Sequence, residues 1–158
     1  MFNIGDKVVY PMHGAGIIEA IEEKEVLGEI RKYYIMRLPI GDMKVMVPIN
    51  NVKDVGLRQV IDTDGVQRVL GILKERDNSQ STNWNRRYRT HMEKIKSGDI
   101  FEVAEVVRNL LLREQEKGLS TGERKMLENA RQILVSELVL AEGSAEDKVE
   151  LMIDGVFG

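Results

Sequence analysis

The sequence predicts an α+β protein, in which a small SH3-like or Tudor-like β-barrel is followed by a compact, all-helical domain. Three observations lead to this prediction. Short runs rich in β-branched and aromatic residues alternate with turn residues up to about residue 56. From residue 57 onwards, apolar residues recur at helical spacing instead. The chain has 158 residues, of which 42% are hydrophobic, and this is enough for a packed core.

Four short runs are expected to form the strands of the N-terminal domain, over residues 7–10, 16–21, 33–38 and 43–48. Turn-forming glycine, proline and aspartate residues separate them, in segments 5–6, 11–16, 27–29 and 39–42. A sheet of four or five such short strands cannot bury both of its faces. We therefore expect residues 1–56 to curl into a barrel.

Capping residues and apolar periodicity predict four helices between residues 57 and 142. The first two are expected over 64–75, after capping oxygens at residues 62–64, and over about 85–95. A third helix, over 100–117, follows a capping box at Asp99, and a fourth follows a clearer capping box formed by Ser120 and Glu123. Since the last two helices carry wide apolar stripes, residues 57–142 should form one compact helical domain.

The acidic tail over residues 143–158 contains only a few apolar side chains. Two alternatives remain open for it. It can be frayed, or it can dock on the helical domain as a last half-helix. The sequence assigns it no function.

Composition argues against several classes of protein. The chain has no cysteine, so it can form neither a disulfide nor a zinc–thiolate site, which fits a reducing cytoplasm. The N-terminus lacks a signal peptide, and no apolar run is long enough to cross a membrane. His13 and His91 lack the neighbouring ligands of a metal site, and no serine lies in a nucleophile elbow. We therefore expect a cytoplasmic protein with no enzymatic activity, no metal and no cofactor.

The most informative stretch runs from Ser81 to Arg89 and follows a polar segment, 75–83, that should be an exposed loop. It holds the chain's single tryptophan, Trp84, with a tyrosine and three arginines close behind. An aromatic ring beside positive charge can contact both bases and phosphates. A lone tryptophan near a helix start is, however, more often a core residue, and arginines more often form a solvated surface.

The spacing of the arginines separates their expected roles. On a helix beginning near residue 85, Arg86 and Arg89 share one face and would be the phosphate contacts if DNA is bound. Arg87 points away from them and is the better candidate for an ion pair within the protein. Arg124, in the first turn of the fourth helix, either extends the same basic surface or is solvated. With a pI near 5.5, any nucleic-acid contact must be local.

Six short motifs together resemble the bacterial CarD/CdnL family of transcription regulators that bind RNA polymerase. They are IGDKVVYP at residues 4–11, HG at 13–14, VP at 47–48, TNWNRRY at 82–88, SGD at 97–99 and VAEVVR at 103–108. The resemblance covers residues 2 to about 142. It implies that the N-terminal domain is similar to the polymerase-interacting domain of the transcription-repair coupling factor, which pairs a strand with the polymerase β subunit.

The resemblance also implies which residues carry function. The polymerase-binding strand corresponds to Met43, Lys44, Val45, Met46, Val47 and Pro48, a segment suited to edge-strand addition. Family members often carry basic residues at the positions of Lys24 and Met46. Lys24 retains that charge, whereas Met46 does not.

In the helical domain, Trp84 matches the family tryptophan that wedges into the minor groove at the upstream edge of the transcription bubble. Arg86 and Arg89 match positions that hold the DNA backbone. The leading hypothesis is therefore a monomeric, non-enzymatic regulator that stabilises the open promoter complex and binds DNA weakly, with little sequence specificity. The alternative is a polymerase-tethered adaptor whose helical domain binds another protein. An enzyme is the third hypothesis and lacks a recognisable site.

Overall fold

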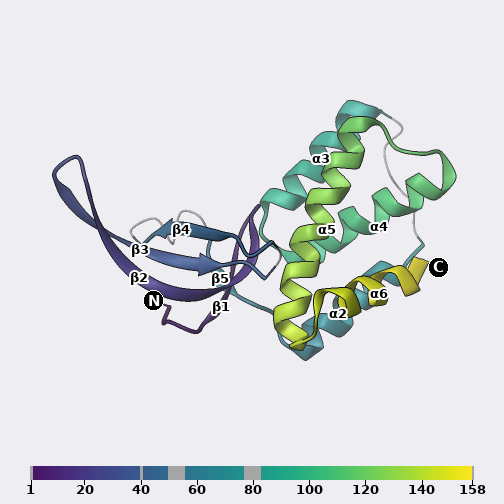
Figure 1. The fold of residues 1–158 in the computed structure, drawn as a ribbon. Helices are drawn as coiled ribbons and strands as arrows, with labels where there is room; N and C mark the ends of the chain where they lie inside the picture. The colour runs from purple at the N-terminus through teal and green to yellow at the C-terminus, as the bar shows by residue number, and fades with distance from the viewer. Residues whose placement is uncertain (1, 40, 50–55, 77–82, 158) are drawn as a thin grey trace.

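The computed structural model describes residues 2–39, 41–49, 56–76 and 83–157. A β-sheet forms one half of the molecule and a group of helices forms the other (Figure 1). The strands are β1 (Lys7–Tyr10), β2 (Gly14–Val26), β3 (Glu29–Arg37), β4 (Lys44–Pro48) and β5 (Arg58–Gln59). They pair antiparallel in the order β4-β3-β2-β1-β5. The predicted α+β class, with the sheet first and the helices second, is confirmed.

The sheet wraps around a small core of its own. Alternate residues of β3, Tyr34 and Met36, point into this core and are almost fully buried, as period-2 patterning requires. The pairing of β2 with β3 shifts at a bulge between Ile18 and Ala20, and such bulges bend a sheet. The core contains Val8, Ile18, Tyr34, Met36, Leu38, Val47 and Leu57. This curved sheet with its own core agrees with the small SH3-like or Tudor-like domain that the strand pattern predicts.

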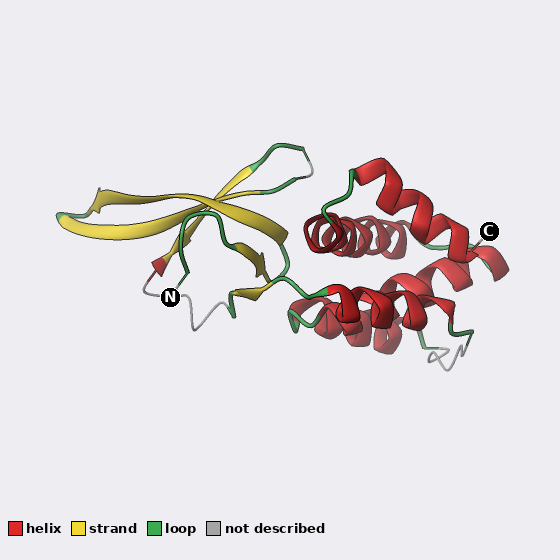
Figure 2. Cartoon of the chain, turned by 90° about the horizontal axis from the view of Figure 1, so that it is seen from below, coloured by secondary structure: helices red, strands yellow, loops and turns green. Residues whose placement is uncertain are grey.

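The β2–β3 hairpin is longer than predicted. Residues 22–32, which lie between the predicted strands over 16–21 and 33–38, are paired along the whole hairpin up to the turn at Leu27 and Gly28. They carry exposed side chains on both faces, because the hairpin projects beyond the core (Figures 1 and 2). Charged residues on both faces hide the alternation that identifies a half-buried strand. Leu27, at the tip, is 98% exposed.

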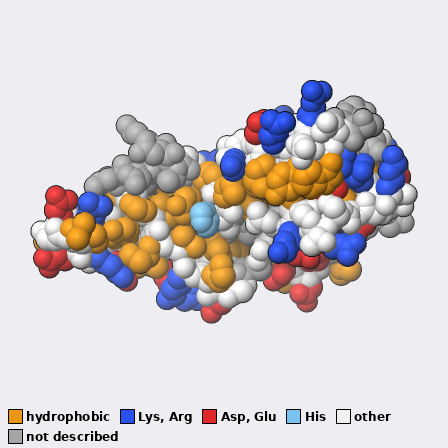
Figure 3. All heavy atoms as spheres, turned by 90° about the horizontal axis from the view of Figure 1, so that it is seen from above, with side chains coloured by type: hydrophobic (Ala, Val, Ile, Leu, Met, Phe, Trp, Pro, Cys, Tyr) orange, Lys and Arg blue, Asp and Glu red, His pale blue; other side chains and the backbone are white. Residues whose placement is uncertain are grey.

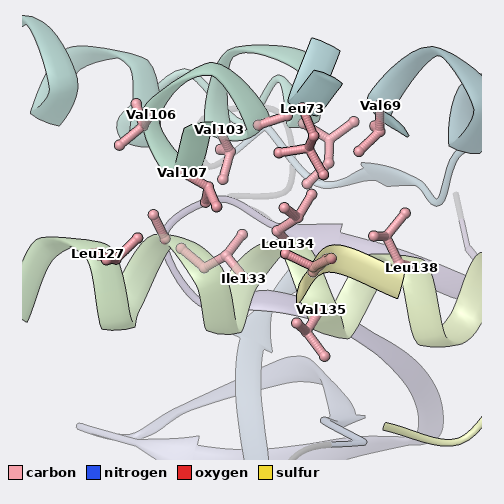
Figure 4. Packing of buried hydrophobic residues seen from close by; sticks show 14 of the residues in the cluster. Val69, Leu73, Val103, Val106, Val107, Leu127, Ile133, Leu134, Val135 and Leu138 are labelled. Carbon is pink, nitrogen blue, oxygen red and sulfur yellow. The ribbon is translucent and has the colours of Figure 1, made fainter. Parts of the chain in front are cut away.

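The helices are α2 (Thr63–Lys74), α3 (Trp84–Lys96), α4 (Ile100–Glu116), α5 (Thr121–Glu142) and α6 (Glu146–Phe157). Asp62, Asp99 and Ser120 are N-cap residues, as the capping patterns predict. The long helix α5 packs against α4 and α2, and Figure 4 shows Leu73, Val107 and Leu134 pointing towards one another in the buried cluster. The helices form one compact domain because they share a single apolar core.

The C-terminal tail docks as a full helix. Val149 and Ile153 of α6 are completely buried against the helical core. Arg131 of α5 also holds α6 in place through ion pairs to Glu150 (2.6 Å) and Asp154 (2.7 Å). Of the two alternatives for the tail, docking is therefore the one observed. The domain limits at residues 56 and 142 stay a prediction.

The two halves meet along α5. The carboxylate of Glu137, fully buried on α5, accepts hydrogen bonds from both terminal nitrogens of Arg58 and from the backbone N–H of Ile61. Ser136 accepts from the backbone N–H of Ala15 at 2.8 Å. Gly14 permits this close approach, since a Cβ there would lie 2.7 Å from the Ser136 hydroxyl. The barrel is therefore fastened to the helix that also forms the helical core.

Candidate nucleic-acid interface

Trp84 is the first residue of α3 and lies at the surface. Asn83 is the N-cap, and its side chain accepts from the backbone N–H of Arg86 at 3.1 Å. The helix therefore begins one residue earlier than predicted, and Trp84 is held in regular structure. Its side chain is 43% exposed, so it is not the core residue that a lone tryptophan most often is. Most of the predicted loop over 75–83 lies outside the described residues.

The indole of Trp84 rests on two neighbours. It stacks on the ring of Tyr88, one helical turn later, with ring centroids 5.1 Å apart and an interplanar angle of 20°. Its Nε1–H donates to the hydroxyl of Ser120, the N-cap of α5, at 3.3 Å. Gly122 lies close to the ring, since a Cβ on this glycine would lie 3.7 Å from Trp84 Cζ2. The exposed tryptophan thus lies across the N-terminus of α5.

Arg87 forms the predicted internal ion pair. Its Nε donates to Glu123 Oε2 at 3.0 Å, and both side chains are almost completely buried. Burial opposes ionisation of Glu123, but the hydrogen bond and charge of Arg87, the charge of Arg113 and the hydroxyl of Ser120 outweigh it and lower the pKa of this carboxyl. A charged pair therefore joins α3 to α5, and Glu123 also accepts from Ser120, the residue that contacts the tryptophan.

Arg86 and Arg89 are both exposed and line one shallow depression with Thr90 and Glu93, which agrees with the shared helix face expected from their spacing. Arg124 is exposed in the first turn of α5, the helix end on which Trp84 rests. In Figure 3, Lys and Arg side chains surround an apolar band on the helical half of the molecule. An aromatic side chain with cations around it can contact both a base and the nearby phosphates.

In the strand predicted to bind polymerase, some side chains are exposed and others are buried. β4 is at one end of the strand order, with β3 as its only partner among the described residues. Lys44 and Met46 are exposed, whereas Val47 is fully buried in the barrel core and Val45 and Pro48 are partly buried. The side chain of Val47 therefore cannot contact a partner directly, and only its backbone can contribute.

The other predicted contacts lie on accessible surface. Met43, just before β4, is 55% exposed, and Lys24 is exposed in the projecting part of β2. The register pairs Met46 with Ile35, and Ile35 with Ala20. Since side chains alternate along a strand, Lys24 lies on the same face of the sheet as Met46. The two positions matched by resemblance therefore share one surface.

The described residues contain no cluster of three or more His, Asp or Glu side chains arranged to hold a metal ion. None of the helices in the described ranges has the length and apolarity needed to span a membrane. His91 is buried, and its Nδ1 makes no hydrogen bond to the described part of the chain. Burial, followed by the charge of Lys94, lowers the pKa of His91 to about 4, so it is neutral at physiological pH.

Two family models match the chain and together cover both halves. The CarD-like/TRCF RID domain matches residues 2–61, and the CarD C-terminal domain matches residues 68–154. The chain belongs to the CarD family. CarD-like proteins are non-enzymatic transcription regulators, and the prediction that this chain is not an enzyme is thereby confirmed. The second match includes most of α6, so the family likeness extends past residue 142, where the sequence motifs suggest that it ends.

A full-length relative agrees with this assignment, and two solved structures are similar to part of the chain. The YdeB protein of Bacillus subtilis (strain 168), described as a candidate transcription factor, is 44% identical over 150 residues, which span 95% of this CarD-family chain and 98% of YdeB. The solution NMR structure of the 72-residue N-terminal domain of Myxococcus xanthus CarD is 37% identical, covers 37% of this chain and 79% of that one, and has a TM-score of 0.33. CdnLNt from Myxococcus xanthus is 42% identical over 39% of this chain and 86% of its own, with a TM-score of 0.34.

No local pattern in the sequence connects Ser120 and Glu123 with Trp84. Both residues are visible in the sequence as a capping box, which is a local signal. In the structure, Glu123 does not complete the usual box, because its carboxylate turns towards Arg87 and the Ser120 hydroxyl. Only the packing of α3 against α5 reveals that the cap also contacts the tryptophan.

Proposed function

We propose that this protein binds the β subunit of RNA polymerase through β4 and stabilises the open promoter complex by placing Trp84 at the upstream edge of the transcription bubble. The observation that carries the proposal is the exposure of Trp84. It is the only tryptophan of the chain, 43% exposed at the start of a helix, with the exposed Arg86 and Arg89 on the same helix. A large aromatic side chain left at the surface beside cations is suited to stacking on a base.

The polymerase contact would use strand addition. A strand at the end of a sheet presents unpaired backbone groups to a partner strand. Side-chain specificity would come from the exposed Lys44 and Met46, with Met43 at the start of the strand and Lys24 on the same sheet face. Val45, Val47 and Pro48 would contribute mainly through the backbone.

The energetics of a wedge favour DNA that is already open. Unstacking one base step costs a few kcal/mol, whereas stacking an aromatic ring on the exposed base returns about 1–3 kcal/mol. Trp84 would therefore slow the closing of a bubble and would not melt a closed duplex. Because a wedge and a few phosphate contacts read little base sequence, promoters would respond according to how readily they open.

DNA binding by the isolated protein should be weak. Contacts to two or three phosphates, from Arg86, Arg89 and Arg124, correspond to a salt slope of only about −2 to −3. Binding to the polymerase raises the effective concentration of DNA near the helical domain, so that a weak contact becomes productive. One copy, acting in the cytoplasm on polymerase-bound promoters, would suffice.

The test compares wild-type and Trp84→Ala proteins in polymerase open complexes on one promoter. Trp84→Ala should shorten the open-complex lifetime, by about tenfold for each 1.4 kcal/mol of lost stacking, without weakening polymerase binding. Leu151→Ala is a matched control, because Leu151 is a large apolar side chain that is 71% exposed on α6. An unchanged lifetime for Trp84→Ala would contradict the wedge.

Charge reversal separates DNA binding from the adaptor alternative. Arg86→Glu with Arg89→Glu should also shorten the lifetime and reduce its dependence on salt, since both side chains would face phosphates. If these changes leave the lifetime unaltered while Trp84→Ala shortens it, the helical domain acts by binding another protein.

A further inference from the structure

Ser120 uses its hydroxyl group completely. The oxygen accepts the indole N–H of Trp84 at 3.3 Å and the backbone N–H of Glu123 at 3.2 Å. The hydroxyl donates to Glu123 Oε1 at 3.2 Å. A serine hydroxyl offers one donor and two acceptor positions, so this group has no further hydrogen-bonding capacity. The N-cap of α5 and the support of the tryptophan are therefore one and the same side chain.

The second partner, Glu123, connects this hydroxyl to the interior. Only 3% of Glu123 is exposed, and its other oxygen accepts from Arg87, which is itself buried on α3. Arg113 of α4 approaches the same oxygen at 3.8 Å. A buried carboxylate fixed by a guanidinium has little freedom to rotate, because every other orientation leaves a charge without a partner. The hydrogen-bond chain from the indole thus ends at a rigid point shared by three helices.

Two further contacts support the indole. One face stacks on Tyr88, and Gly122 lies close to Cζ2 of the six-membered ring. Ser120 is an exposed residue, so water competes for its hydroxyl and the hydrogen bond alone is modest. Together these contacts define one orientation of a side chain that nevertheless remains 43% exposed. A surface side chain held before binding loses less conformational freedom when it binds.

We propose that Ser120 and Glu123 are positioning residues, which hold the indole of Trp84 in the orientation that contacts DNA. This inference rests on the proposed function of Trp84. It adds that the N-terminus of α5 supports the DNA contact without touching the DNA. The cap residue of one helix then sets the activity of a side chain on another.

The first experiment examines the ring itself, without DNA or polymerase. Trp84 is the only tryptophan, so its fluorescence reports this side chain alone. Ser120→Ala should increase quenching by acrylamide and lower the fluorescence anisotropy at a temperature well below unfolding, and Ser120→Thr should restore both. Asp99→Ala is the matched control, because Asp99 is also an N-cap, accepting from the backbone N–H of Phe101, whereas the indole N–H donates to Ser120. If Ser120→Ala and Asp99→Ala behave alike, the positioning role is wrong.

The second experiment measures open-complex lifetime with the same variants. Ser120→Ala should shorten the lifetime by roughly two- to tenfold, the range that corresponds to loss of one ordinary hydrogen bond, while Ser120→Thr and Asp99→Ala stay near wild type. Glu123→Gln, which keeps the size of the side chain but weakens the link to Arg87, should act in the same direction. If Trp84→Ala shortens the lifetime and Ser120→Ala does not, the positioning role fails while the proposed function stands. If Trp84→Ala itself has no effect, the proposed function fails.

Discussion

The joint between the barrel and the helices leads to the most demanding prediction. Arg58 donates to both oxygens of Glu137 at 2.8 Å, and the backbone N–H of Ile61 donates to the same carboxylate at 2.9 Å. Glu137 is completely buried, whereas 30% of the Arg58 side chain reaches solvent. The proposed DNA binding from a polymerase-bound barrel would need this joint, since the joint fixes where the helical domain lies relative to the barrel.

Replacing Glu137 or Arg58 with alanine should lower the free energy of unfolding by different amounts. Removing one member of a buried ion pair destabilises a protein by about 3–5 kcal/mol, because the remaining charge is left without a partner. Glu137→Ala should cost about 3 kcal/mol, since Arg58 can turn to solvent, and Arg58→Ala about 5 kcal/mol, since the buried carboxylate cannot. The matched control is Glu150→Ala, which breaks a solvent-accessible pair with Arg131 and should cost only about 0.2–1 kcal/mol.

Urea unfolding followed by circular dichroism measures these costs for both halves together. A second readout is the distance between the halves. Because the chain has no cysteine, spin labels can be placed on cysteines introduced at Leu27 and Leu151, both highly exposed. The distance distribution should broaden in Arg58→Ala and stay narrow in Glu150→Ala. If Arg58→Ala costs no more than Glu150→Ala and leaves the distribution unchanged, the pair does not hold the two halves together.

Two further predictions concern the helical core. The pKa of His91 is about 4 in the folded protein against 6.5 when unfolded, so its contribution to stability is complete above pH 6.5 and is lost as the pH falls towards 4. The wild type should lose about 1.4 kcal/mol by pH 5.5, and His91→Leu should flatten this loss in urea unfolding measured between pH 7 and 5; equal slopes would contradict it. Ile153→Ala should cost about 2–5 kcal/mol because Ile153 is fully buried, measured as a lowered urea midpoint against Leu151→Ala. A cost below that of Leu151→Ala would mean that the tail does not share the helical core.

Local patterns predict most of the helices, and they fail where charge or length conceals a strand. The caps at Asp99 and Ser120 act through backbone groups a few residues away, so they can be recognised in the sequence alone. The two-residue strand β5 is too short to show any period. The outer half of the β2–β3 hairpin carries polar residues on both faces, and only its pairing identifies it as a strand.

The roles of the charged residues depend on contacts between distant segments. Glu137 lies on α5 among apolar residues, and nothing near it in the sequence marks it as buried; its partner Arg58 is 79 residues away. Composition similarly leaves two alternatives for the C-terminal tail. Its docking is decided by the apolar surface that α2 and α5 leave for Val149 and Ile153, a surface that exists only after those helices pack.

By itself, the sequence determined the order of sheet and helices, the family, and the position of one tryptophan among arginines. Those features depend on periodicity, capping and motifs, which act over a few residues. Only the tertiary structure decided that Trp84 is exposed, that the partner of Arg87 is Glu123 and that Ser120 supports the indole. Ser120 lies 36 residues from Trp84, and the two meet only because α3 and α5 pack side by side.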